Sequence, residues 1–267
     1  YARRYGSTNT FEKNNYPVGY NLGQSGNTPS QNLVDAYEMI DGTPFDWNNP
    51  EHKSNPYANR DPRLAMSILT NNVEFKDRTI EAWTGGRDGK GVIHATRTGY
   101  YIYKFIDPNL DLLQNRTSVH HWVIMRYAEI LLSYAEAMNE AYGPTGNVGY
   151  RLNAVRALNQ VRNRVGVEMP AVPTAISKEE LREKIRNERR VELDLEDHRF
   201  WDVRRWMIAP ETLGAPLRGV EITKISDEEF EYKPIEVEKR TFEPKMYLYP
   251  IPQADLNTTG WVQNPLW

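Results

Sequence analysis

Aromatic side chains lie among amides in several loop-like stretches of this sequence, and this pairing suits the binding of sugars. Residues 1–30 are rich in Gly, Asn, Ser, Thr and Pro, which indicates surface loops. An exposed ring can stack on the apolar face of a pyranose, while Asn and Gln amides both donate to and accept from its hydroxyls. The predicted ligand-binding residues are Tyr16, Tyr20, Asn21, Gln24, Trp47 and Trp83.

Structural roles are the alternative for several aromatic residues. Tyr1 and Tyr5 fit an irregular or frayed segment better than a binding surface. Trp83 lies in the Gly-rich stretch 81–91, which we expect to be a flexible loop and not a phosphate loop, because GxxxxGK[ST] does not occur. There Trp83 either contacts a ligand or folds under the loop and covers the core. The alternation of Tyr100, Tyr101 and Tyr103 indicates an extended segment whose tyrosines are mostly core.

Catalytic and metal-binding arrangements are weakly supported. Glu188, Glu192 and Glu196 form a helical row, but His198 follows at a spacing that points it off the row, so a salt-bridged helix is the better interpretation. Neither HExxH nor GxSxG occurs. Glycoside hydrolysis needs only two carboxylates, and acidic residues lie beside the loop aromatics, yet nothing favours a catalytic role for any of them. These acids are Asp46, Glu81 and Asp88.

Composition narrows the class of protein further. The 267 residues include no Cys, which excludes disulfides, thiolate catalysis and Cys-based metal sites. The net charge is −3 and no basic block occurs, so nucleic acid is not an expected partner. No apolar run is long enough to span a membrane, no EF-hand spacing supports Ca²⁺, and no cofactor is indicated.

Three helices are predicted in the centre of the chain. Residues 122–141 are strongly helical in composition and end at Gly143-Pro144, and residues 148–165 carry a continuous apolar stripe. A short turn between two amphipathic helices predicts an antiparallel hairpin. The third helix starts at Ser177, where Glu180 completes a capping box. We expect its acidic row to be neutralised by nearby arginines of the same stretch: Arg186, Arg189, Arg190 and Arg199.

The remaining segments complete a predicted single domain over 1–267. Residues 1–121 form a loop-rich ligand-binding region, 122–208 the helical core, and 209–267 C-terminal loops that pack back on the helices. Ser30 is expected to cap a short helix over 31–40, and residues 221–240 alternate weakly, as in a hairpin. Arg60, Asp61 and Arg63 favour a structural ion-pair network at a turn over a functional cluster.

Several motifs in a fixed order resemble the SusD/RagB family. They include NLVDAYEMIDG at 32–42, NRDPRL at 59–64, ATRTGYYIYKFIDP at 95–108 and MRYAEILLSYAEAMNEA at 125–141. IRNERRVELDLEDHRFWDVRRW at 185–206 and the ending that starts YLYPIPQADLN at 247–257 add to them. The resemblance runs along most of the chain.

This resemblance implies a mainly α-helical fold of TPR-like helical hairpins with long irregular loops and a few short strands. It implies a non-catalytic, lipid-anchored nutrient-binding protein of Bacteroidetes on the extracellular face of the outer membrane. The implied ligand is an oligosaccharide or polysaccharide, and the implied partner is a SusC-like TonB-dependent transporter. Members of the family have roughly twice this length, so we expect the chain to be the C-terminal half, without the lipid anchor.

Two other classes of function stay open. One is a scaffold that binds peptides or proteins in a groove between helices. The other is a carbohydrate-active enzyme, for which the resemblance gives no support. Peptide binding without glycan binding would identify the first, and turnover that depends on carboxylates would identify the second.

Overall fold

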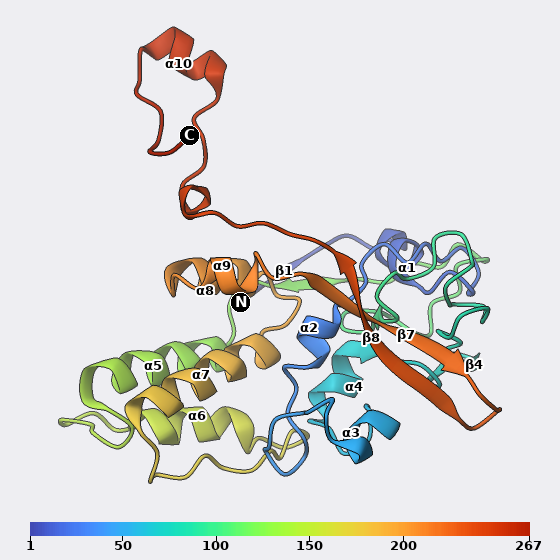
Figure 1. Ribbon diagram of the computed structural model, residues 1–267, viewed down its shortest axis with the longest axis horizontal. Coiled ribbons are helices and arrows are strands. Elements are labelled where there is room, and N and C mark those ends of the chain that lie inside the picture. The colour runs from blue at the N-terminus through green and yellow to red at the C-terminus, as the bar shows by residue number, and fades with distance from the viewer.

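The computed structural model describes all 267 residues, and its main body contains a layer of three helices, as the sequence predicts. Helices α5 (Tyr127–Tyr142), α6 (Ala154–Arg162) and α7 (Lys178–Glu192) lie side by side at one end of the molecule (Figure 1). Ala135, Ala154 and Ala157 are fully buried between them, which lets the helix backbones approach closely. The mainly helical fold with short strands and long loops is therefore confirmed.

The predicted helix boundaries were too generous, because neighbouring contacts override local propensity. Trp122 belongs to strand β6 (His121–Val123), which pairs antiparallel with β1 (Ala2–Arg4), so α5 starts five residues later than expected. Helix α6 begins only where the side chain of Asn153 accepts from the backbone N–H of Arg156. Beyond α7 the backbone turns at Leu195 and Asp197, both with positive φ, before helix α8 (His198–Arg205).

The start of α7 follows the sequence prediction closely. The Ser177 hydroxyl accepts from the backbone N–H of Glu180 at 3.1 Å, and the Glu180 carboxylate accepts from the backbone N–H of Ser177 at 3.0 Å. This reciprocal capping box satisfies two backbone donors that a helix otherwise leaves unpaired. It fixes where the most charged helix of the protein begins.

Residues 1–123 form the loop-rich part of the molecule, in which every element is short. Ser30 caps α2 as expected, but the helix has four residues and not the ten that the sequence indicated. The strands pair two by two, β1 with β6, β2 with β5 and β3 with β4. The other elements are α1 (Thr10–Asn15), α2 (Gln31–Val34), α3 (Pro50–Ser54), α4 (Arg63–Ser67), β2 (Ile68–Leu69), β3 (Glu74–Phe75), β4 (Arg78–Thr79) and β5 (Tyr101–Ile102).

The C-terminal part begins with α9 (Ala209–Thr212) and a long hairpin of β7 (Leu217–Lys224) and β8 (Phe230–Glu238). The hairpin lies against the loop-rich part and buries Val220, Ile222 and Tyr232. The short helix η1 (Pro244–Tyr247) then contacts α8, because Arg204 donates to the carbonyls of Met246 and Tyr247. The hairpin predicted for the weakly alternating stretch 221–240 is thus confirmed: the stretch holds the end of β7, the turn and all of β8, and the first strand starts four residues earlier, at Leu217.

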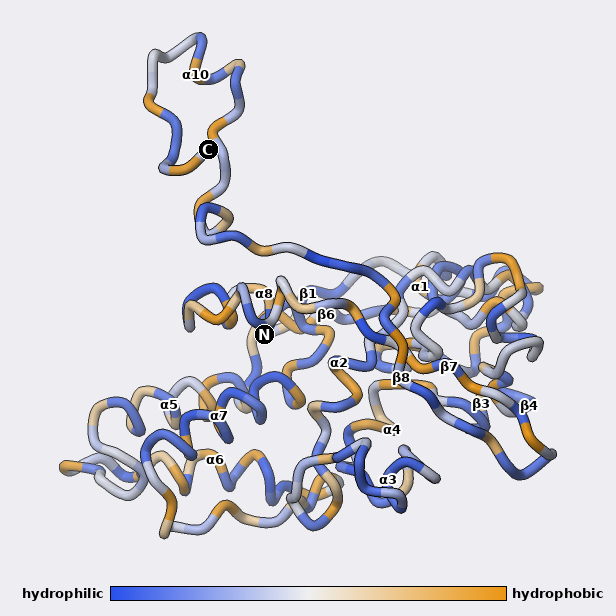
Figure 2. Tube along the Cα trace, viewed as in Figure 1, coloured by the Kyte–Doolittle hydropathy of each residue, from blue (hydrophilic) through white to orange (hydrophobic).

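The end of the chain differs from the expectation that it packs back on the helices. Beyond η1 the backbone runs away from the body to α10 (Gln253–Thr259), and Figure 2 shows apolar stretches along this outlying segment. Trp261 is 63% exposed and Val262 is 88% exposed. The local hydrogen bonds of Gln263 with Ile251 hold the segment together without attaching it to the helices.

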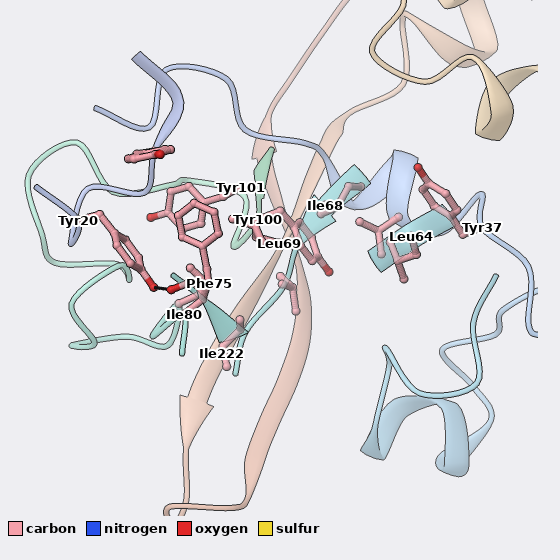
Figure 3. Close-up of a cluster of buried hydrophobic side chains, with 14 of the residues drawn as sticks. Tyr20, Tyr37, Leu64, Ile68, Leu69, Phe75, Ile80, Tyr100, Tyr101 and Ile222 are labelled. Carbon is pink, nitrogen blue, oxygen red and sulfur yellow. Dashed lines mark hydrogen bonds between the residues drawn. The ribbon is translucent and has the colours of Figure 1, made fainter. Parts of the chain in front are cut away.

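Two separate apolar cores result from this arrangement. One lies between α5, α6 and α7, and it includes Leu132, Leu158 and Leu181. The other fills the loop-rich part and is dominated by aromatic residues, among them Tyr100 and Tyr101, whose burial confirms their predicted core role (Figure 3). Val191 of α7 is the one residue of the three helices that belongs to the aromatic core, so direct apolar contact between the two parts is narrow.

Buried ion pairs join them. Arg63 of α4, only 4% exposed, donates to Asp61 in its own turn and across to Glu188 and Glu192 of α7, at 2.5 and 2.9 Å. Arg162 of α6 donates to Glu188 and to Glu38 of the loop-rich part. The predicted ion-pair network is therefore present at Asp61 and Arg63 and reaches much further than the turn, but Arg60 is not part of it and donates to backbone carbonyls instead.

Only Glu188 and Glu192 of the predicted acidic row lie on α7, because the helix ends at Glu192 and Glu196 lies in the turn that follows. Cations from outside the predicted stretch neutralise all three. Glu192 accepts from Arg63, Arg126 and Arg164, and Glu196 accepts from Arg126 and Lys104. Of the four predicted partners, Arg189 pairs instead with Asp202 of α8, at 3.0 Å. The predicted partners were wrong, because cations from distant elements fill the space beside the row.

Removing Arg63 should destabilise the protein strongly. Arg63→Met leaves the buried carboxylates of Asp61, Glu188 and Glu192 short of a cation, which typically costs about 3–5 kcal/mol. Urea unfolding followed by circular dichroism measures this loss. Arg182→Ala, which breaks an exposed pair with Glu140, is the control and should change the midpoint little. An Arg63→Met midpoint equal to that of the control would contradict the bridging role.

Glu192 should make the stability depend on pH. Burial alone would raise its pKa, but hydrogen bonds and charges of Arg126 and Arg164 lower the pKa below its ordinary value. A carboxylate with a lowered folded pKa stabilises the protein fully above its unfolded pKa, about 4.3, and this contribution disappears as the pH falls towards the folded value. Glu192→Gln should therefore be clearly less stable than the original protein at pH 7. The difference should shrink between pH 5 and 3, and a constant difference in urea midpoints would contradict this.

Candidate functional site

Tyr16 follows the last residue of α1 and points into the aromatic core. Its ring is 1% exposed, and its hydroxyl donates to the carbonyl of Asp107 at 2.5 Å. The ammonium of Lys76 lies 5.0 Å from the ring centroid. Burial and the nearby carboxylates of Glu12 and Asp107 raise the pKa of this phenol. The expectation of an exposed ring is wrong for Tyr16, because the core takes the ring and a backbone carbonyl takes its hydroxyl.

Tyr20 is placed in the same way. It is 7% exposed, and its hydroxyl donates to the carbonyls of Phe75 and Arg78 at 2.8 and 3.0 Å (Figure 3). The guanidinium of Arg78 covers one face at 3.9 Å from the centroid, and Phe75 contacts the ring edge-on. Burial raises the pKa of the Tyr20 phenol. No open face is left on which a sugar could stack, which corrects the expectation for this ring as well.

The two tryptophans are half-buried and lie apart from these tyrosines. Trp47 donates from Nε1 to Asp35 at 3.0 Å and contacts Phe45 edge-on. Trp83 packs on Phe230 of β8 with ring centroids 5.4 Å apart. Both rings pack against the aromatic core, so each has a structural role, and both side chains remain partly exposed. Ligand contact by Trp47 or Trp83 stays a prediction.

The glycine-rich loop that carries Trp83 is compact, in contrast to the flexible loop expected. Asp88 is fully buried in it and accepts from Arg78 at 2.7 Å and from the backbone N–H groups of Gly19 and Glu81. At Gly89 an added Cβ would come within 1.7 Å of the Trp83 carbonyl, so only glycine fits. Asp88 thereby ties this loop to the segment of Tyr20.

Three of the predicted residues line one open hollow of about 600 Å³: Tyr16, Tyr20 and Asn21. The buried tyrosines form its floor, and Asn21 lies exposed at its edge. Residues 76–78 form one wall of the hollow, and residues 108–113 form another. Gln24 is exposed but lies outside the hollow, as do Trp47 and Trp83.

The hollow is polar and presents unused hydrogen-bonding groups. The side chains of Asn21, Asp77 and Asn109 are exposed and make no hydrogen bond within the protein. Lys76 donates to the carbonyls of Pro108 and Leu110, both at 2.9 Å, which fixes one wall against the other. Amides and carboxylates on a fixed wall suit a ligand with many hydroxyls.

Asp77 and Asn109 were not predicted from the sequence. Asp77 lies in the tight turn between β3 and β4, and Asn109 lies in a turn after Asp107, whose carboxylate accepts from the Asn109 backbone N–H. Asp and Asn in such turns are commonly explained by local backbone bonding. Only the folded chain shows that these two turns face Asn21 across one hollow.

A larger hollow of about 830 Å³ lies beside α7 and is acidic. Five carboxylates and one ammonium, Lys184, line it. Lys184 and Arg162 pair with Glu38, and Glu180 forms the capping box. The remaining carboxylates of this wall are those of Asp35, Glu179 and Glu183.

The acidic residues beside the loop aromatics are engaged in structural bonds. Asp88 is paired with Arg78, Glu81 is paired with Arg87 at 2.6 Å, and Asp46 accepts from Asn48 at the surface. No group of three or more His, Cys, Asp or Glu side chains has the arrangement that a metal ion needs. No helix combines the length and the apolar content of a membrane-spanning segment.

Solved structures share this architecture. A SusD-like protein from Bacteroides fragilis has a TM-score of 0.80 and 29% identity, and the match covers 100% of this chain and 54% of that one. A SusD-like carbohydrate-binding protein from the same species has a TM-score of 0.72 and 31% identity over 88% of this chain and 48% of its own. The arrangement of a helical layer beside a loop-rich aromatic core is therefore the SusD-like fold.

Sequence comparisons agree with the structural ones. The model of the SusD family matches residues 1–267, and the chain belongs to this family. Two SusD-like proteins of Formosa agariphila are 35% identical over 104 residues and 32% identical over 120 residues. These matches cover 37% and 43% of this chain but only 19% and 22% of the relatives. The chain thus spans about half the length of the first solved relative and aligns with smaller parts of the curated ones.

Tyr20 should behave as a core residue when it is replaced. Tyr20→Ala removes a buried ring and should cost about 3–5 kcal/mol of unfolding free energy. Tyr20→Phe keeps the ring but leaves two carbonyls without their donor, which should cost about 1 kcal/mol. Urea unfolding gives both values. A Tyr20→Ala protein as stable as the original would show that the ring is not part of the core.

Proposed function

We propose that this protein captures a glycan without chemical turnover. The observation that carries the proposal is the open polar hollow at Asn21, Asp77 and Asn109, whose side chains are exposed and free of internal hydrogen bonds. Membership of the SusD family supports it, since one related structure is that of a carbohydrate-binding protein. The ligand is an oligosaccharide or a section of a polysaccharide.

Recognition in this hollow depends on hydrogen bonds more than on stacking. Adjacent sugar hydroxyls can donate to the Asp77 carboxylate and exchange bonds with the amides of Asn21 and Asn109. The rigid floor of Tyr16 and Tyr20 keeps these walls in place, so less entropy is lost on binding. Each contact contributes about 0.5–1.5 kcal/mol, and repeated units of a long glycan raise the overall avidity.

The same proposal places the complete protein at the extracellular face of the outer membrane, held by a lipid anchor. There it would pass the glycan to a SusC-like TonB-dependent transporter. Family membership is the support for both statements.

A second candidate function is capture of basic peptides in the acidic hollow beside α7. Glu38, Asp35 and Glu183 are paired with cations in this hollow of about 830 Å³. The exposed carboxylates of Glu179 and Glu180 remain and would attract Lys- and Arg-rich segments. The carbohydrate-active enzyme is less well supported, since the acids near the loop aromatics are paired or exposed singly.

The test is affinity electrophoresis through gels that contain single polysaccharides. The original protein should be retarded by at least one of them. The triple variant Asn21→Ala/Asp77→Ala/Asn109→Ala should bind that polysaccharide about tenfold more weakly or worse, because it loses three polar contacts. Trp47→Ala and Trp83→Ala, run beside it, show whether either tryptophan contributes.

Gln160→Ala, exposed on α6 far from the hollow in sequence, is the control and should migrate like the original protein. Circular dichroism confirms that every variant is folded. A folded protein that no glycan retards, but that binds lysine-rich peptides, would replace the proposal with the peptide-binding scaffold. Release of reducing ends from the retarding polysaccharide would show an enzyme.

A further inference from the structure

A third hollow, of about 560 Å³, lies where the helical layer, the loop-rich part and the β7–β8 hairpin meet. It is distinct from the glycan-binding hollow and shares no lining residue with it. Four arginines line it, and each comes from a different element or loop: Arg190, Arg199, Arg218 and Arg240. We call it the arginine pocket.

Arg199 of α8 has no partner in the protein. Its guanidinium makes neither a salt bridge nor a hydrogen bond, although the residue is half-buried. Its nitrogens are not sealed from solvent, so they remain open to a molecule that enters the pocket. The charge of Asp202 lies near enough to act on Arg199, but Asp202 accepts its bonds from Arg189 and Arg205.

Arg190 of α7 lacks a carboxylate partner as well. One of its nitrogens donates to the backbone carbonyl of Asn32. Burial, together with the positive charges of Arg199 and Arg218, lowers the pKa of Arg190 to about 10. Like charges held together at a buried site are costly, and an anion between them would relieve that cost.

Two of the three acidic residues that line the pocket, Asp35 and Asp194, are already paired with cations. Asp35 accepts from Arg218 at 2.8 Å, as well as from Gln31 and Trp47. Asp194 accepts from Lys104 and from the hydroxyl of Tyr37. The third acidic residue, Glu211, is exposed.

Arg240 also lacks a carboxylate partner, because it donates only to the carbonyls of Ala215 and Thr212. The pocket therefore holds an excess of positive charge.

Buried arginines elsewhere in the protein have their partners within the protein itself. Arg63, Arg162 and Arg189 each donate to carboxylates at 3.2 Å or less. Arg60 has no carboxylate, but three backbone carbonyls and the face of Phe45 enclose it, and it lines none of the main hollows. Arg199 and Arg190 differ because they line an open pocket and leave donors for a ligand.

We infer that the arginine pocket binds an oxyanion, carboxylate or sulfate, that is carried on the glycan as a uronic acid or a sulfate ester. Guanidinium groups match such oxygens with paired, charge-assisted hydrogen bonds. That the oxyanion is attached to a sugar rests on the proposed function, whereas the anion site itself does not.

A neighbouring hollow of about 480 Å³ gives the sugar itself a place. Arg199 lines both this hollow and the arginine pocket, and Trp201 of α8, which is 63% exposed, lines this hollow as well. Phe200 supports Trp201 edge-on at a centroid distance of 5.1 Å. A ring stacked on Trp201 could therefore direct an acidic substituent towards Arg199.

Isothermal titration calorimetry at constant ionic strength tests the inference on the whole chain. The titrants are sodium sulfate, sodium phosphate, an oligosaccharide of uronic acids, its carboxyl-reduced neutral counterpart, and a sulfated oligosaccharide with its desulfated form. An acidic oligosaccharide should bind at least tenfold more tightly than its neutral counterpart. Arg199→Gln should remove that advantage. Arg156→Gln removes the same charge from an exposed position on α6 and should leave the affinity advantage of the acidic oligosaccharide unchanged.

The outcomes separate the site from the proposed function. Equal binding of acidic and neutral oligosaccharides would overturn the inference and leave the proposed function standing, and so would an acidic advantage that Arg199→Gln preserves. Binding of free sulfate or phosphate that Arg199→Gln abolishes, without binding of any oligosaccharide, would keep the anion site and reject its place on a glycan. No binding of any anion would overturn the inference altogether.

Discussion

The fold depends on a buried network of ion pairs that joins two apolar cores. Glu188 and Glu192 of α7 accept from Arg63 of the loop-rich part and from Arg162 and Arg164 of the helical layer. Buried ion pairs of this kind add little net stability compared with apolar packing, but they tolerate the loss of a partner badly. They therefore help to specify how the two parts sit against each other, together with the narrow apolar contact that Val191 of α7 makes in the aromatic core.

Local sequence signals predicted local structure well and distant partners poorly. The capping box at Ser177 and Glu180 depends on four consecutive residues, so the sequence alone predicts it. Periodicity identified the acidic row, yet it could only suggest cations within reach along the same stretch. The actual partner Arg63 lies 125 residues away from Glu188. No spacing rule for a helix contains that information.

The candidate site shows the same limit. Composition predicted a loop region rich in aromatics and amides, but it could not say which rings face inwards. Tyr16 and Tyr20 are buried because backbone carbonyls accept their hydroxyl protons, which removes the penalty of burying a phenol. Asn21 has no such partner and stays at the surface. Whether a residue is buried in the floor of the hollow or exposed at its edge thus depends on hydrogen-bond partners about 50 to 100 residues away in the sequence.

The network also explains why the arginine pocket is unusual. The chain carries 36 acidic and 33 basic side chains, so the supply of carboxylates does not limit pairing. Arg63 and Arg126 obtain two or more carboxylates each, and they do so by reaching across elements. Arg199 belongs to the same charged stretch and lies near Asp202, yet other arginines occupy that carboxylate. Arg199 and Arg190 both line an open pocket without a carboxylate partner, and this contrast supports the inference that a ligand supplies their missing oxyanion.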